Sequence, residues 1–130
     1  MAGRSVIAFA IGMEKRILLV EDDLELRDSV QDILESEGYE VVPAANGKQA
    51  LEYLRSTSGG DGAPSLVVLD LMMPIVSGWQ VLEALHEDPE LELPVIVVSA
   101  SGCARPDGVS AFLRKPFDVD ELLETIHERS

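Results

Sequence analysis

The sequence predicts an α/β fold with a doubly wound, five-stranded parallel sheet, and three observations lead to this fold class. Five short apolar runs alternate with segments whose apolar residues recur at helical spacing, the pattern of strands joined by crossover helices. The run at residues 66–69 is apolar throughout, as in a strand that is buried on both faces. The 130 residues, 46% of them hydrophobic, suffice for one core but not for two domains of ordinary size.

Residues 1–12 differ in character from the rest of the chain. They include Ala8-Phe9-Ala10, a small-x-small pattern that faintly resembles a signal-peptide cleavage site, but too few apolar residues precede it. The segment is also too short to span a bilayer. We therefore expect residues 1–12 to be an extension outside the domain, and residues 13–130 to form the domain.

The first half of the domain predicts two strands, each followed by a helix. The first helix ends at Gly38, since glycine commonly terminates helices. The second helix begins at a capping-box spacing between Asn46 and Gln49, and the polar, glycine-rich residues 58–64 form a loop after it. The strands are residues 17–20 and 39–42, and the inward-facing helix positions are Leu26, Val30, Ile33 and Leu34, then Ala50, Leu51 and Leu54.

The second half continues the alternation with three strands and two helices. A second capping-box spacing, between Ser77 and Gln80, begins a helix in which we expect Trp79 to be a packing residue. The last helix begins near Asp118. The strands are residues 66–70, 95–99 and 111–114, and the inward-facing helix positions are Val81, Leu82 and Leu85, then Val119, Leu122, Leu123 and Ile126.

The connection at residues 100–110 is unusual, because it is barely long enough for a crossover between parallel strands. It has Gly102 and Gly108 near its ends and almost no apolar stripe, and Pro106 disfavours helical backbone at Arg105. We therefore predict that the helix between the fourth and fifth strands is missing or reduced to a turn.

Five strands fit the flavodoxin-like order 2-1-3-4-5, which places the first strand beside the third. Glu21, Asp22 and Asp70 then meet at the switch point, and Ser99 and Lys115 end the next two strands along the same edge. A lone aspartate after a strand usually only caps a turn, but here the other carboxylates accompany it. Because close carboxylates repel each other unless a cation lies among them, we expect a metal site, with Mg²⁺ as the best candidate.

Composition excludes several classes of function. The formal charge of −14 disfavours direct binding to nucleic acid or to an anionic membrane surface. The single cysteine, Cys103, excludes an internal disulfide and a cysteine-based zinc cluster. We expect a cytoplasmic protein.

With these residues assembled, the chain from about Glu14 onward resembles the response regulator receiver domains of two-component signalling. Each motif is weak alone, but the set in this order is highly specific. The motifs are Val20-Glu21-Asp22, Leu69-Asp70-Leu71-Met72-Met73-Pro74 followed by Gly78, Val98-Ser99-Ala100, and Lys115-Pro116-Phe117.

The resemblance implies that Asp70 accepts a phosphoryl group from a histidine kinase or phosphotransfer protein, or from a small donor such as acetyl phosphate. It implies that Asp22, Asp70 and the backbone carbonyl of Met72 ligate Mg²⁺, with Glu21 acting through water. Beyond phosphorylation and autodephosphorylation with Mg²⁺, no enzyme activity is implied.

The resemblance also assigns roles to three residues around the phosphoacceptor. Lys115 and Ser99 contact the phosphoryl oxygens, and Ser99 and Phe112 form a switch in which the aromatic ring moves inward. The Lys115-Pro116 bond is cis in the family, although sequence alone favours trans. Receivers normally carry the helix that residues 100–110 disfavour.

Four alternatives remain open at this stage. A phosphatase or dehalogenase with an aspartate nucleophile usually has a second acid two residues further on, where this chain has Met72. A flavodoxin-like electron carrier needs hydroxyls and free amides where the loop after Val20 is acidic. A phosphate sink or a constitutive protein-binding module would use the same fold. Since no output domain follows Ser130, we expect a single-domain receiver whose phosphorylated surface contacts an unknown downstream protein.

Overall fold

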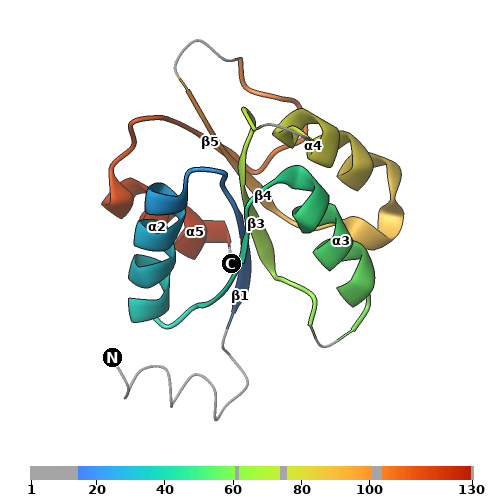
Figure 1. Cartoon of the computed structure of the whole chain (residues 1–130), viewed down its shortest axis with the longest axis horizontal. Coiled ribbons are helices and arrows are strands. Elements are labelled where there is room, and N and C mark those ends of the chain that lie inside the picture. The colour runs from blue at the N-terminus through green and yellow to red at the C-terminus, as the bar shows by residue number, and fades with distance from the viewer. Residues whose placement is uncertain (1–14, 61, 74–75, 101–103, 130) are drawn as a thin grey trace.

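A computed structural model describes residues 15–60, 62–73, 76–100 and 104–129 of the chain. Its sheet has five parallel strands in the order β2-β1-β3-β4-β5, which confirms the predicted topology (Figure 1). Residues 66–70 are fully buried, as the apolar run predicted. The strands are β1 (Arg16–Val20), β2 (Glu40–Ala44), β3 (Leu66–Asp70), β4 (Val95–Ser99) and β5 (Ala111–Arg114).

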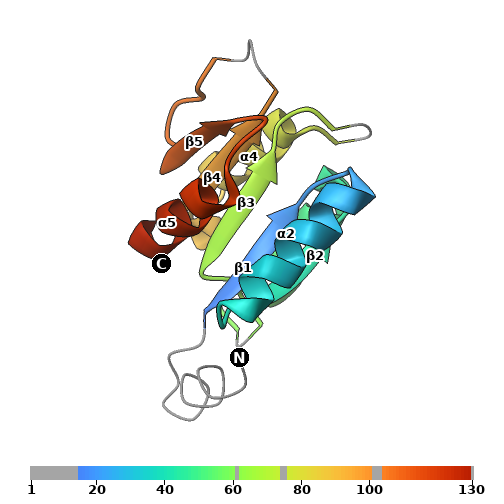
Figure 2. The same cartoon turned by 90° about the vertical axis from the view of Figure 1, so that its left-hand side faces the viewer.

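Helices cover both faces of the sheet, so the fold is doubly wound. Helices α2 (Leu24–Ser36) and α5 (Val119–Arg129) lie in front of the sheet in Figure 2, and α3 (Gly47–Thr57) and α4 (Gly78–Glu87) lie on the opposite face. A short 3₁₀ helix, η1 (Pro89–Leu91), links α4 to β4. The alternating side chains of β1, β3 and β4 therefore enter two separate cores, one under each helix pair.

Polar capping residues fix where the helices start. They thereby also fix the loops that join the carboxyl ends of the strands to these helices. At α4 the Ser77 Oγ accepts from the Gln80 N–H and the Gln80 side chain accepts from the Ser77 N–H, so the predicted capping box is complete. At α3 only half of the prediction holds, because the Gln49 Oε1 accepts from the Ala45 N–H at 2.7 Å rather than from that of Asn46.

The described part of the connection between β4 and β5 contains no helix, as predicted. Residues 104–110 form an irregular segment with a turn at Asp107 and Gly108, and Gly108 has a φ of 77°, which favours glycine. Pro106 and Val109 are buried, and the Ser110 N–H donates to the Val95 carbonyl at 2.9 Å. The segment is therefore attached to the domain without forming a helix.

Two further sequence expectations can be compared with the structure, and a third falls outside it. The Lys115-Pro116 peptide bond is cis, as in the resembling family. Trp79, expected to be a packing residue at the start of its helix, is 45% exposed, so only part of its surface is covered. Residues 1–12 lie outside the described residues, and within the described part no helix is long and apolar enough to cross a membrane.

Candidate functional site

The predicted acidic site lies at the carboxyl ends of β1 and β3, which are hydrogen-bonded neighbours in the sheet. Glu21 and Asp70 are buried, with 3% and 2% of their surface exposed, whereas Asp22 is exposed. One carboxylate oxygen from each of the three residues lies within 4.8 Å of the others. The structure therefore brings together the three carboxylates that the sequence predicted.

Lys115 reaches the same cluster from the end of β5. Its Nζ is 2.9 Å from Glu21 Oε1 and 3.3 Å from Asp70 Oδ2, and its backbone N–H donates to the Ser99 carbonyl at 2.6 Å. The β4 and β5 strand ends thus hold the ammonium group against both buried carboxylates. The shorter contact is to Glu21, to which the sequence assigned only a role near the metal.

Backbone donors orient the carboxylates within the cluster. The Met72 N–H donates to Asp70 Oδ1 at 3.1 Å, and the Asp23 N–H donates to Glu21 Oε2 at 3.2 Å. Arg27, on the first turn of α2, donates to the Glu21 carbonyl at 2.8 Å. The sequence analysis missed Arg27, because its position in an amphipathic helix gave no sign that its side chain would reach back to the strand end.

Gly78 allows helix α4 to start directly against the end of strand β3. A Cβ at this position would lie 2.3 Å from the Asp70 carbonyl oxygen, and the Gly78 N–H donates to the Leu71 carbonyl at 3.0 Å. No side chain fits at that distance, so glycine is required here by a close backbone approach.

The electrostatics of the cluster favour an added cation. The pKa of Glu21 is raised to about 7, chiefly by burial and also by the charge of Asp70, while the hydrogen bond from Lys115 opposes the rise. Burial also raises the pKa of Asp70, although Lys115 opposes this. Burial lowers the pKa of Lys115, but the hydrogen bond to Glu21 and the charge of Asp70 outweigh it, so the net shift is upward. One ammonium group therefore has to balance the negative charges of two carboxylates, and a divalent cation would stabilise both carboxylates in their charged forms.

The donor set fits Mg²⁺. All three clustered side chains offer hard carboxylate oxygens, and the exposed Asp22 leaves the site open to water ligands and phosphate oxygens. Among the described residues, this is the only group of three acidic or metal-ligating side chains close enough to hold an ion.

Ser99 and Phe112 lie beside the cluster rather than in it. Ser99 is fully buried at the end of β4, and its Oγ donates to the Ala100 carbonyl at 3.3 Å. Phe112 lies opposite Val97 in the sheet and is half-buried, with the Arg114 guanidinium carbon 5.2 Å from the centre of its ring. The two residues are on adjacent strands, as a coupled switch requires.

Comparison with known proteins identifies the family of this site. The family profile described as the response regulator receiver domain matches residues 17–127. The response regulator Rre1 of Synechocystis is 42% identical over 114 residues, which are 82% of this chain and 47% of Rre1. The polar-differentiation response regulator DivK of Brucella anthropi is 34% identical over 121 residues, which are 88% of this chain and 94% of DivK.

Solved structures agree with this assignment. The response regulator protein TrrA of Thermotoga maritima, in complex with Mg²⁺-BeF, has a TM-score of 0.77 and 32% identity over 89% of this chain and 99% of TrrA. The chain spans about half the length of some curated relatives, such as Rre1 and the transcriptional regulatory protein SphR of Synechococcus elongatus, but nearly all of DivK. The matched region contains the acidic site, four strands in full and all of β1 except Arg16. The chain therefore belongs to the response regulator receiver domain family of two-component signalling.

Proposed function

We propose that Asp70 is the phosphoacceptor of this receiver domain. The observation that carries the proposal is the contact of Asp70 Oδ2 with Lys115 Nζ at 3.3 Å, inside a cluster that also contains Glu21 and Asp22. Receiver domains are generally phosphoacceptors rather than conventional enzymes, and Asp70 is the buried carboxylate at the end of the central strand. An aspartate carboxylate is an established nucleophile for phosphoryl groups.

The chain's own residues would hold Mg²⁺ next to this nucleophile. Asp22 and Asp70 would be direct ligands together with the backbone carbonyl of Met72, and Glu21 would act through water. The complex of the related TrrA with Mg²⁺-BeF supports this choice of metal. When bound, the ion neutralises charge on the phosphoryl oxygens and orients them, which is most of what phosphoryl transfer requires.

Three side chains complete the proposed mechanism. Lys115 provides a fixed positive charge that can pair with a phosphoryl oxygen, since its ammonium already lies against Asp70. The Ser99 hydroxyl leaves the Ala100 carbonyl and donates to the phosphoryl group instead. The movement of this strand end frees space that the half-buried Phe112 ring enters, so the surface near β5 reports phosphorylation.

The donor is a histidine kinase or phosphotransfer protein, because response regulators receive their phosphoryl group from histidine kinases. Small donors such as acetyl phosphate can also supply the phosphoryl group, through Mg²⁺-assisted self-phosphorylation, and the protein removes the group again by autodephosphorylation. The charge of −14 disfavours direct contact with nucleic acid, and a cytoplasmic location remains a prediction.

A phosphate sink or a constitutive binding module would share the site but would not pass on a phosphorylation-dependent change. A phosphatase-like enzyme is disfavoured because Met72 occupies the position of its second acid.

Intact-mass measurement after incubation with acetyl phosphate tests the proposal. Wild-type protein should gain the mass of one phosphoryl group with Mg²⁺ and none with EDTA, and Asp70→Asn should gain none under either condition. The matched control, Asp118→Asn, changes an exposed aspartate outside the cluster and should label as wild type does. Equal labelling of Asp70→Asn and wild type would contradict the assignment.

A further inference from the structure

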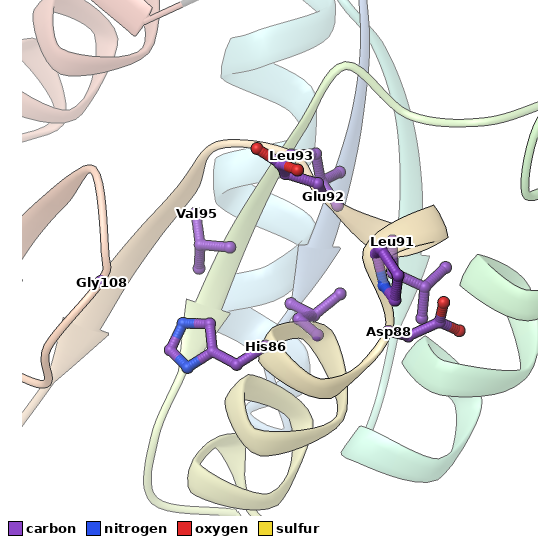
Figure 3. Close-up of a pocket in the computed structure, with 9 residues that line it drawn as sticks. His86, Asp88, Leu91, Glu92, Leu93, Val95 and Gly108 are labelled. Carbon is purple, nitrogen blue, oxygen red and sulfur yellow. The ribbon is translucent and has the colours of Figure 1, made fainter.

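Two hollows border the exposed side of helix α4, where the segment 104–110 passes without forming a helix. The first is about 430 Å³ and lies between the α4 residues Trp79 and Glu83 and the loop residue Pro106. The second is about 530 Å³ and lies between the end of α4, η1, the start of β4 and Gly108. Both are lined by His86, which in Figure 3 points from α4 toward the segment carrying Gly108. We call the two hollows together the α4 groove.

A close approach between Gly108 and His86 separates the two hollows. Gly108 approaches His86 so closely that a Cβ there would lie 2.9 Å from the imidazole Nε2, and its φ of 77° sets the turn that carries the loop over the helix. The loop and the helix therefore make close contact at Gly108 and His86, and no described residue covers the hollows on either side of that contact.

The floor of the groove is apolar and its rim is acidic. Trp79, Leu82, Glu83 and His86 follow helical i, i+3, i+4 and i+7 spacing, so they form one stripe along α4. Trp79 is 45% exposed, which is unusual for a large aromatic side chain and supplies an apolar anchor point. The rim carries five carboxylates, and among the described residues neither lysine nor arginine lines it: the carboxylates are Glu83, Glu87, Asp88, Glu92 and Asp107.

These charges define what could fill the groove. Within the described residues Glu83 and Glu87 have no ion-pair or hydrogen-bond partner, so both remain available to an incoming cation. A bound metal ion does not explain them, because the only ion-sized cluster in the described part of the chain is at Asp70. A second copy of the chain is also disfavoured, because a symmetric contact would place carboxylates against carboxylates.

We propose that the α4 groove binds a basic, amphipathic segment of another protein, whose apolar side chains contact Trp79 and whose lysines or arginines pair with Glu83 and Glu87. Helical partner segments commonly place apolar residues in a groove in this way. Complementary charge at the rim steers association and selects against acidic partners. None of the groove residues belongs to the Asp70 cluster, so the proposal is independent of the phosphoacceptor assignment.

Titration calorimetry of the full, unphosphorylated chain with synthetic peptides tests this surface. The probe is an amphipathic leucine-lysine helix at about 0.15 M ionic strength, and its leucine-glutamate counterpart is the negative control. The double variant Glu83→Gln/Glu87→Gln should weaken binding of the lysine probe about fivefold, as expected for two lost surface ion pairs. Trp79→Ala should weaken it about tenfold, as expected for an aromatic anchor.

The matched control is Glu121→Gln/Glu124→Gln, which removes two exposed carboxylates from the acidic surface of α5. This variant should bind the lysine probe within about twofold of wild type, and wild-type Trp79 fluorescence should change on binding. All substitutions are at exposed positions, and circular dichroism verifies that the variants fold. Equal weakening by the two double variants, equal binding of the two peptides, unchanged Trp79 emission, or no binding to wild type would each overturn the proposal.

Discussion

The substitution Glu21→Gln should stabilise the metal-free protein at neutral and alkaline pH. Glu21 is 3% exposed and its pKa rises from 4.5 to about 7 in the folded chain, chiefly because burial penalises its charge. An acid whose pKa is higher in the folded state than in the unfolded state keeps its proton up to a higher pH when the protein is folded. Folding stability is therefore lost as pH rises from about 4.5 to about 7. Glutamine resembles the protonated side chain and carries no such penalty.

The size of this effect follows from the same shift. A pKa raised from 4.5 to about 7 corresponds to about 3 kcal/mol of lost stability above pH 7 and to none below pH 4.5. The variant should therefore be more stable than wild type by up to about 3 kcal/mol at pH 8, and by almost nothing at pH 4.5. Added Mg²⁺ should reduce the difference, because it stabilises the charged carboxylate of wild type.

Urea unfolding in EDTA at several pH values, followed by the fluorescence of Trp79, measures this difference. Trp79 is the only tryptophan of the chain, so the signal has one source. The control Glu121→Gln removes an exposed carboxylate from α5 and should track wild type at every pH. Two results would refute the electrostatic account of the site. One is a Glu21→Gln variant that is less stable than wild type at pH 8, and the other is a plot of its unfolding free energy against pH that runs parallel to that of wild type.

Three further predictions concern the metal, the backbone and the N-terminus. Asp22→Ala should weaken Mg²⁺ binding more than the loss of any other single side chain except Asp70, because Asp22 is a proposed direct ligand. If calorimetry gives this variant the same Mg²⁺ affinity as wild type, the proposed ligand set is wrong. Gly78→Ala should lose about 2–3 kcal/mol in urea unfolding, because its Cβ would lie 2.3 Å from the Asp70 carbonyl oxygen, whereas Gly60→Ala, with its nearest contact at 3.5 Å, should change little. A chain that starts at Met13 should melt within a few degrees of the full chain and phosphorylate alike, and a collapse in melting temperature would show that residues 1–12 stabilise the domain.

The topology and the edge of the sheet that carries the site could be predicted from sequence. Strands with short apolar runs leave little choice of register, and their carboxyl ends lie together in any parallel sheet. This is why the sequence alone predicts that Glu21, Asp70 and Ser99 lie at strand ends on the same edge of the sheet. The lack of a helix in residues 104–110 was also predictable, because the local propensities of a glycine- and proline-containing segment act without tertiary help.

The features that the sequence did not predict depend on how far side chains reach and on which elements pack beside them. Lys115 lies closer to Glu21 than to Asp70, which is decided by a few tenths of an ångström at the tip of a flexible chain. Arg27 returns to the Glu21 carbonyl across a helix turn, and no periodicity marks such a contact. The exposure of Trp79 depends on which elements pack around the start of α4, and the periodicity of that helix alone does not determine this.

Locating the phosphoryl group tests the central claim most directly. Protein incubated with Mg²⁺ and acetyl phosphate is reduced with borohydride, which converts an aspartyl phosphate to homoserine, and the peptides are sequenced by mass spectrometry. We predict homoserine at Asp70 alone, at a yield that falls to background when Mg²⁺ is chelated. Homoserine at Asp22 or at any other aspartate, with Asp70 unmodified, would contradict the account of the site.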